Sequence, residues 1–193
     1  MTRGPLLSGE MVRLRPVEAR DADRLWESAQ DAEARRLMGA TSAPTREELE
    51  AWAREVTDRP GRYDWAIAPA AVRDGQLVSD ELIGQIVLDD VDDVLRSGSI
   101  HLALLPNYRG RGYGREAVFE VLRYAFEGVG DDAGPHLHRV GLEVLSINPR
   151  ARALYESLGF REEGRLRDVR PDGEGWSDAI VMSILEDEFR AFV

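Results

Sequence analysis

The residues best suited to bind an anion lie in one short stretch, Arg109-Gly-Arg-Gly-Tyr-Gly-Arg115. Its three glycines let the backbone turn tightly and leave the main-chain N–H groups free of side-chain bulk. An apolar run at 99–105 indicates a strand ahead of it, and apolar residues at helical spacing over 116–126 indicate a helix behind it. The amides and the positive end of the helix would then face one point, which favours phosphate. A glycine-rich turn without a ligand is the plainer interpretation.

The sequence argues against two common types of phosphate loop. A Walker loop uses Gly-Lys-Ser/Thr to reach the outer phosphates and magnesium, and this chain contains no lysine. A Rossmann loop has the spacing Gly-x-Gly-x-x-Gly, with an acidic residue about 20 positions later at the end of a second strand. Here the glycines are Gly110, Gly112 and Gly114, and the position about 20 residues further on falls in or just after the predicted helix.

Composition and charge restrict the function further. The 193 residues include 36 acidic and 25 basic residues, and the net charge of −11 argues against nucleic-acid binding and suits a cationic substrate. Cysteine is absent and there are three histidines, so thiolate chemistry is excluded and no metal is expected. No apolar run approaches the roughly 20 residues of a membrane helix, and a signal-peptide core is lacking, so we expect a cytoplasmic protein without membrane contact. The length favours a single domain over 1–193.

The rest of the sequence indicates the elements that would position the glycine stretch. Strands are expected at 11–15, 64–72, 82–88, 99–105, 137–145, 161–169 and 176–185, and helices at 21–30, 32–38, 45–58, 116–126 and 148–159. Turns are expected at Asp74-Gly75 and at 89–93, where a solvated hairpin turn suits the four acids better than a calcium loop. Residues 186–188 are expected to form an acidic tail. The strand-helix-strand-helix order over 99–160 requires a crossover, so we predict an α/β fold with a mixed sheet.

Two motifs, in the same order along the chain, resemble those of one enzyme family. The first is Arg109-x-x-Gly112-x-Gly114, and the second is Leu142-Glu-Val-x-x-x-Asn148-x-x-Ala-x-x-Leu-Tyr155-Glu-x-x-Gly-Phe160. Together they resemble the GNAT family, the acyl-CoA-dependent N-acyltransferases. The fuller patterns over 108–117, 138–139 and 159–164 resemble the subgroup that includes the RimJ and RimL ribosomal-protein N-terminal acetyltransferases. The resemblance implies a GNAT fold, a mixed sheet of about six to seven strands flanked by helices, in which two parallel strands part.

The resemblance also implies acetyl-CoA as the co-substrate. The pantetheine arm would lie between the strands at 99–105 and 138–145 and pair with the main chain at positions 103–105, and the pyrophosphate would meet the amides of 111–115. The residues assigned to the cofactor are therefore Ala103, Leu104, Leu105, Arg109, Gly110, Arg111, Gly112, Tyr113, Gly114, Arg115 and Asn148. Asn148 stands directly before Pro149, the sequence of a helix N-cap, and one side chain can serve both roles.

Transfer to an amine needs a neutral nucleophile and a proton for the leaving thiolate. Tyr155 matches the family's tyrosine acid, and a phenol with a pKa of about 10 is protonated at neutral pH; a core aromatic on a helix face is the alternative. Glu143, which interrupts an apolar strand and resembles the RimI pattern, is our choice for the base, directly or through water. An exposed glutamate on a solvated strand face is the alternative, and His101 is the competing base.

The acceptor is predicted from the fraction of each kind of amine that is neutral at pH 7. An α-amine with a pKa of about 7.7–8.0 is roughly 10–20% neutral at pH 7, whereas a lysine amine near 10.4 is neutral to well below about 0.1%. With only a carboxylate base in view, the α-amine of a protein N-terminus is the easier acceptor. A small cationic amine, a polyamine or aminoglycoside, is the second choice, and a non-catalytic acyl-CoA sensor is the third. Whether the chain forms a homodimer is left open.

Overall fold

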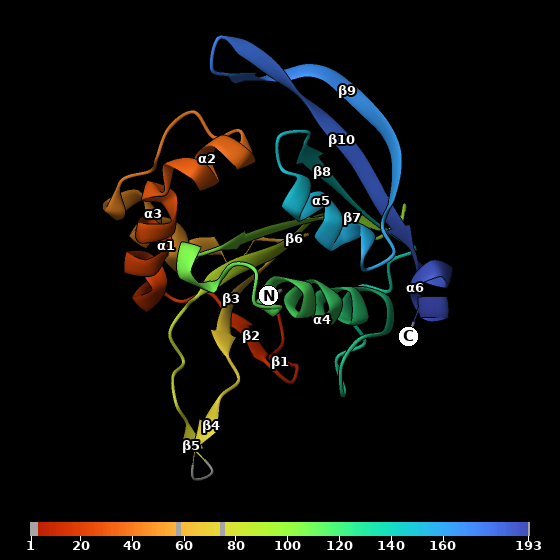
Figure 1. Cartoon of the computed structure of the whole chain (residues 1–193). Helices are drawn as coiled ribbons and strands as arrows, with labels where there is room; N and C mark the ends of the chain where they lie inside the picture. Colours follow the sequence, from red (N-terminus) through yellow and green to blue (C-terminus); the bar gives the residue numbers. More distant parts are fainter. Residues whose placement is uncertain (1–3, 57–58, 74–75, 193) are drawn as a thin grey trace.

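The computed structural model describes residues 4–56, 59–73 and 76–192, and within them eight strands form one mixed sheet (Figure 1). The order across the sheet is β1-β2-β3-β6-β7-β8-β10-β9, and only β7 and β8 run parallel. The strands are β1 (Leu7–Ser8), β2 (Val12–Pro16), β3 (Tyr63–Pro69), β6 (Gly84–Asp92), β7 (Ser97–Leu104), β8 (Arg139–Leu145), β9 (Arg161–Asp172) and β10 (Gly175–Leu185). A separate short hairpin consists of β4 (Val72–Arg73) and β5 (Gln76–Leu77).

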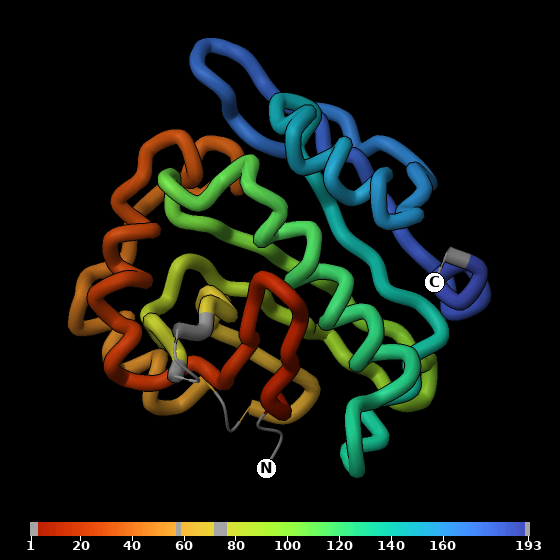
Figure 2. The backbone as a smooth tube through the Cα atoms, turned by 60° about the horizontal axis from the view of Figure 1, so that its bottom comes forward, coloured from red at the N-terminus to blue at the C-terminus, as the bar shows by residue number. Residues whose placement is uncertain are grey.

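Helices cover both faces of this sheet, since α4 packs on one face and α1 and α3 pack on the other; α4 is the green coil in Figure 2. They are the 3-10 turns η1 (Ala19–Asp21) and η3 (Pro106–Tyr108) and the helices α1 (Ala22–Gln30), α2 (Ala32–Met38), α3 (Arg46–Glu55), α4 (Tyr113–Glu127), α5 (Pro149–Glu156) and α6 (Glu186–Phe192). The larger core joins α4 and α5 to Trp65 and Ile67 of β3. A smaller core on the other face joins Ala66 to Leu25 of α1 and Ala53 of α3. Successive residues of β3 thus serve two cores, because side chains alternate along a strand.

The two parallel strands pair only at their beginnings. The paired positions are Ser97 with Arg139, Gly98 with Val140, and Ser99 with Gly141. From Ile100 onwards β7 pairs with β6 alone, and from Leu142 onwards β8 pairs with β10 alone. The strands therefore part toward their carboxyl ends and open a gap in the middle of the sheet. The mixed α/β sheet with two parting parallel strands, expected from the resemblance, is confirmed.

The acidic segments differ from their predicted conformations. A turn is predicted over 89–93, but β6 continues to Asp92, whose Oδ1 accepts hydrogen bonds from Val94 N at 2.8 Å and Leu95 N at 2.7 Å in the turn that follows. The predicted acidic tail is the first turn of α6. Phe189 of α6 is fully buried, with its ring 5.4 Å from that of Phe126. One apolar residue behind three acids is enough to fix this helix on the core.

Other differences are small. The sheet has one strand more than the seven ranges predicted, because the two-residue β1 pairs with β2. The predicted turn at Asp74-Gly75 lies outside the described residues, as does the predicted end of the third helix at 57–58. In the described ranges no helix is both long and apolar enough to span a bilayer.

Candidate active site

The gap between β7 and β8 opens into a cavity of about 650 Å³. Its walls come from α2, β7, the glycine loop (residues 109–114) and the beginning of α5. The lining residues are Glu33, Ala34, Arg36, Leu37, Met38, Leu102, Ala103, Leu104, Arg109, Gly110, Gly112, Gly114, Arg115, Ile147, Asn148, Pro149, Arg150, Ala151, Ala153, Leu154 and Ser157. The volume is typical of a cofactor or small-molecule site. We call this space the gap cavity.

The glycine loop presents bare main chain to the gap cavity. Gly110 and Gly112 have φ angles of 73° and 92°, in the left-handed region that favours glycine. Gly112 is the N-cap of α4, and no side chain caps the first amides of this helix, so they are available to an anion. A Cβ on Gly114 would lie 3.0 Å from Leu102 Cδ2 and 3.3 Å from Leu154 Cδ1. Glycine at this position therefore lets α4 approach β7 and α5, the two walls of the gap, at the same time.

The main chain of β7 forms the edge of the gap. The N–H of Leu105 is bonded to Ile83 O on the β6 side, at 2.9 Å. Because main-chain groups alternate in direction along a strand, the N–H and C=O groups of Leu104 and Leu102 face the gap, and those of Ala103 face β6. Of the three predicted edge residues, Ala103 and Leu104 line the gap cavity, whereas Leu105 does not. The predicted segment therefore contains two residues that line the cavity and one that does not, and its pairing with a cofactor stays a prediction.

Arg109 is held by the protein itself. Its Nε donates to Leu104 O at 3.0 Å, Nη1 donates to Glu33 at 3.3 Å, and Nη2 is bonded to Asp31. These bonds connect α2 to the edge of β7. The side chain therefore shapes the cavity wall, although the sequence suggests a direct contact with phosphate.

Two other arginines are better placed to meet negative charge. Arg115, in the first turn of α4, and Arg150, in the first turn of α5, both line the gap cavity, and neither forms an ion pair with a described residue. Arg111 is exposed and does not line the cavity. Positive charge that is not neutralised thus concentrates beside the free amides of α4.

Asn148 caps α5 and also lines the gap cavity. Its Oδ1 accepts a hydrogen bond from Ala151 N at 3.1 Å, and Pro149 occupies the first helical position. The predicted N-cap is therefore confirmed. Because the cap uses only the oxygen of the amide, the Nδ2 donor remains for a ligand in the cavity.

Tyr155 lies in the core below the cavity wall. Its side chain is 7% exposed and packs against Phe160, with ring centroids 5.5 Å apart. Burial raises the pKa of Tyr155 to about 12. The residues Ala151 and Leu154 of the same helix reach the gap cavity, whereas Tyr155 is not among its lining residues. The phenol is therefore firmly protonated at neutral pH, as a proton donor requires.

The two candidate bases lie on the same face of the sheet. Ser99 and Gly141 are paired, so His101 of β7 and Glu143 of β8 follow two residues further on and project to the same side. Glu143 is exposed, so the cost of burying an unpaired carboxylate does not apply to it. His101 is 54% exposed and its Nε2 lies 3.1 Å from Asp89 Oδ1. The hydrogen bond to Asp89 raises the pKa of His101, which favours the protonated form and weakens it as a base.

A charged network beside His101 was not predicted from the sequence. Arg62 donates to Asp64 at 2.7 and 3.0 Å and to Asp89 at 3.0 Å, and Gln85 Nε2 donates to Asp64 Oδ1 at 2.9 Å. The side chain of Asp64 is fully buried, and this burial raises its pKa. These residues come from β3, from the position directly before it and from β6, and they lie beside His101 of β7, so no short motif could reveal them.

Glu116 lies within the pattern at 108–117, and no role for it was predicted from the sequence. One of its oxygens accepts from Glu10 N, and the other accepts from Met11 N and Val12 N, all at 2.8 Å. The carboxylate thus fastens the β1–β2 turn to the first turn of α4. It supports the glycine loop from outside the gap.

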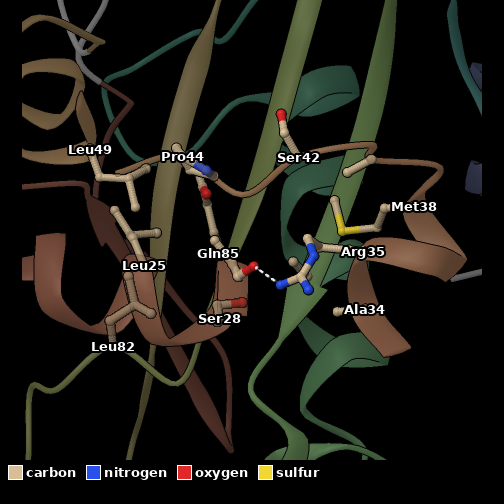
Figure 3. A pocket seen from close by; sticks show the side chains of 14 residues that line it. Leu25, Ser28, Ala34, Arg35, Met38, Ser42, Pro44, Leu49, Leu82 and Gln85 are labelled. Atoms are coloured by element: carbon tan, nitrogen blue, oxygen red, sulfur yellow. Dashed lines mark hydrogen bonds between the residues drawn. The ribbon is translucent and has the colours of Figure 1, made fainter. Parts of the chain in front are cut away.

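A second, smaller cavity of about 180 Å³ adjoins the gap cavity (Figure 3). Both cavities are lined by Ala34, Met38 and Ala103. The other walls of the smaller cavity are Leu25, Ser28, Ala29, Arg35, Ala40, Ser42, Pro44, Leu49, Leu82, Gly84 and Gln85. We call it the side cavity. The sequence indicated helices here but, apart from Ala103, identified no residue of this cavity, because small and apolar residues carry no recognisable motif.

Comparison with known proteins gives one family. The model of the acetyltransferase (GNAT) domain matches residues 12–161. The Bacillus subtilis protein YdaF, a proposed ribosomal N-acetyltransferase, is 29% identical over 188 residues, 93% of this chain and 94% of YdaF. Spermidine N(1)-acetyltransferase of Vibrio cholerae is 31% identical over 108 residues, 56% of this chain and 59% of that enzyme. The ribosomal protein bS18-alanine N-acetyltransferase of Escherichia coli is 36% identical over 102 residues, 53% of this chain and 60% of that enzyme. The chain therefore spans less than two thirds of the last two.

Solved structures agree with this result at the level of the fold. Spermidine N-acetyltransferase from Vibrio cholerae, in complex with CoA and spermine, superposes with a TM-score of 0.79 at 23% identity, over 94% of this chain and 99% of that one. A GNAT-family acetyltransferase from Bacillus anthracis superposes with a TM-score of 0.78 at 21% identity, over 95% and 99%. With a domain match over most of its length, a sheet that parts between β7 and β8, and bare amides at the mouth of the gap, the chain belongs to the GNAT acetyltransferase family.

Proposed function

We propose that this chain transfers the acetyl group of acetyl-CoA to a primary amine, and that the amine is the α-amine of a protein N-terminus. The observation that carries the proposal is that β7 and β8 part, and that two adjoining cavities of unequal size share a wall at β7. The larger one has the free amides and unpaired arginines that suit a diphosphate. The smaller one offers the acceptor a separate approach to the same edge of β7.

The residues of the gap cavity suit CoA in three places. The amides at the beginning of α4, with Arg115 and Arg150, would hold the pyrophosphate. The main chain of Leu102 and the N–H of Leu104, whose C=O already accepts from Arg109 Nε, would pair with the amides of the pantetheine arm, and the Nδ2 of Asn148 would donate to it. Bound acetyl-CoA supplies an activated acyl group, and these residues orient it at the gap.

Tyr155 and Glu143 are proposed as acid and base. A phenol kept protonated by burial would hold a proton for the departing sulfur, whose conjugate acid has a pKa near 8.5. Glu143 would take the proton from the amine, directly or through water, on the face that it shares with His101. An exposed carboxylate is a modest base. An acceptor amine is therefore acetylated more easily if much of it is already neutral. Deprotonating an α-amine costs about 3.4 kcal/mol less than deprotonating a lysine-type amine at the same pH.

The side cavity also favours an α-amine over a polyamine. Its lining contains one charged side chain, the cationic Arg35, and no carboxylate. A polyamine would meet this guanidinium with like charge, whereas a peptide would offer it a carbonyl oxygen. The second candidate, a small cationic amine, is supported by the spermidine-acetylating relative and by Asp64 and Asp89 on the neighbouring strands.

The test is thiol release from acetyl-CoA with three separate acceptor pools. Peptides with free N-termini and no lysine, spermidine with spermine, and aminoglycosides are each added to the same enzyme preparation. The proposal expects release with the peptides, with the acetyl group on the α-nitrogen by mass spectrometry. Release with only one of the other pools would transfer the assignment to a small cationic amine. Tight CoA binding without release in any pool would favour an acyl-CoA sensor.

A further inference from the structure

The residues that line the side cavity determine which chemical groups can bind in it. Leu25, Leu49 and Leu82 form an apolar wall on the side of α1 and α3, as Figure 3 shows. The remaining positions are mostly alanine, glycine, proline and serine. Such a lining gains from burying a small apolar group and loses from burying an unpaired charge.

Its size narrows the contents further. The volume is about 180 Å³. A cavity of about 150 Å³ lined by leucine, isoleucine and phenylalanine takes up benzene, so the side cavity suits an aliphatic side chain up to the size of leucine or methionine. An indole ring is larger than either of these side chains.

Besides two serines, two longer polar side chains line this mostly apolar space. Arg35 donates through Nη1 to Ala29 O at 2.7 Å, which fixes the side chain while its other guanidinium N–H groups stay available. Gln85 donates to Asp64, so its Oε1 remains as an acceptor. One donor for a carbonyl and one acceptor for an N–H, on either side of an apolar pocket, match the first residue of a peptide.

The side cavity also lies where that first residue would have to be. It shares Ala103 of β7 with the gap cavity, and the main chain of Leu104, the next residue, faces the gap. The α-amine of an acceptor must reach the gap to be acetylated. Its side chain, one carbon away, would then be at the mouth of the side cavity.

We infer that the side cavity is the specificity pocket for the side chain of the acceptor's first residue, and that it selects small and medium apolar residues. This inference rests on the proposed transfer to a protein N-terminus. Arg35 would donate to the carbonyl of the first residue and Gln85 would accept from its amine.

The experiment compares acetylation of one peptide series that differs only in its first residue: glycine, alanine, valine, methionine, tryptophan and aspartate. For the unmodified enzyme, we expect kcat/KM for the valine and methionine peptides to exceed that for the glycine peptide by at least about tenfold, since a methylene in an apolar pocket has an effect of that order. The tryptophan and aspartate peptides are expected to fall below glycine.

Two variants test whether the side cavity causes this order. Ser28→Leu fills the cavity from α1, and we expect it to lower kcat/KM for the methionine peptide at least about tenfold more than for the glycine peptide. Leu49→Ala enlarges the cavity from α3 and is expected to move the preference toward tryptophan. Gln30→Leu is the matched control, since Gln30 is exposed on α1 and lines neither cavity. CoA affinity and melting temperature are measured for each variant as controls for folding.

The outcomes separate this inference from the proposed function. Acetylation of every peptide without regard to the first residue, or a preference that Ser28→Leu and Leu49→Ala both leave unchanged in folded protein, overturns the inference and leaves N-terminal acetylation standing. Acetylation of spermidine and of no peptide overturns both.

Discussion

At the scale of single residues, the chemistry of the site depends on which side chains are protonated at neutral pH. Tyr155 is buried and its pKa is raised to about 12, so it is a donor at all ordinary pH values. His101 carries its extra proton more firmly than a free histidine, because Asp89 holds it. The exposed Glu143 then remains as the carboxylate on the acceptor face. The desolvation argument that first suggested Glu143 does not hold, because its side chain is exposed, and its role as the base stays a proposal.

Tyr155→Phe should lower kcat by about 10²-fold or more, the usual contribution of a general acid. CoA affinity and the free energy of unfolding should change little, because the ring still packs on Phe160. Steady-state kinetics and calorimetric titration with CoA measure both. Tyr124→Phe is the matched control, since this buried tyrosine bonds to Asp132 in another part of the molecule. Equal kcat values for Tyr155→Phe and the unmodified enzyme would remove the acid assignment.

The ion pair of His101 should make stability depend on pH. The folded-state pKa is raised above the unfolded value of about 6.5, so the stabilisation is complete below about pH 6.5 and is lost as the pH rises through the folded pKa. Asp89 forms ion pairs with both His101 and Arg62, so Arg62 is the other charged side chain that contacts the pair. The free energy of unfolding in urea should therefore fall as the pH rises from about 6.5 through the folded-state pKa of His101 in the unmodified protein. His101→Gln should reduce that fall, and an identical slope in the variant would contradict the assignment.

At the scale of elements, α4 is the part that organises the site, and it is fixed from both ends of its first turn. Gly114 lets it approach β7 and α5, and Glu116 fastens it to the β1–β2 turn. The amides that face the gap therefore belong to a helix that is held by its neighbours before any ligand arrives. A site built on a fixed helix end needs no ordering when it binds.

Glu116→Gln should destabilise the protein by about 1–3 kcal/mol, because the amide nitrogen of glutamine would face main-chain N–H donors that now bond to a carboxylate. Urea denaturation measures this change. CoA affinity should fall as well, since the first turn of α4 loses its support. Glu127→Gln, an exposed change at the other end of the same helix, is the control and should be neutral. A variant as stable as the control would show that the three hydrogen bonds contribute nothing.

At the scale of the whole molecule, the order of strands and helices could be predicted from the sequence more fully than the side-chain contacts between them. Alternation and helical spacing located all seven of the longer strands, and the order over 99–160 required the crossover that makes β7 and β8 parallel. The bonds of Arg109 to Asp31 and Glu33, and the network of Arg62, could not be predicted. They join residues that are far apart in the chain, and a pattern of spacing reports only what is near in sequence. Most residues of the side cavity could not be predicted for a further reason, since small and apolar side chains carry no recognisable motif.

The break in the sheet has one more consequence, for how such a protein can change over time. The groups that Leu102 and Leu104 offer to the gap are peptide groups, and every amino acid except proline carries the same pair. Substitution at these two positions would alter packing but would leave the hydrogen bonds on offer as they are. The affinity for a ligand that completes the sheet is therefore protected from most mutations at the residues that provide it. The side cavity has no such protection, because its walls consist of side chains, and under the proposed function a new acceptor could be acquired there without disturbing the binding of the cofactor.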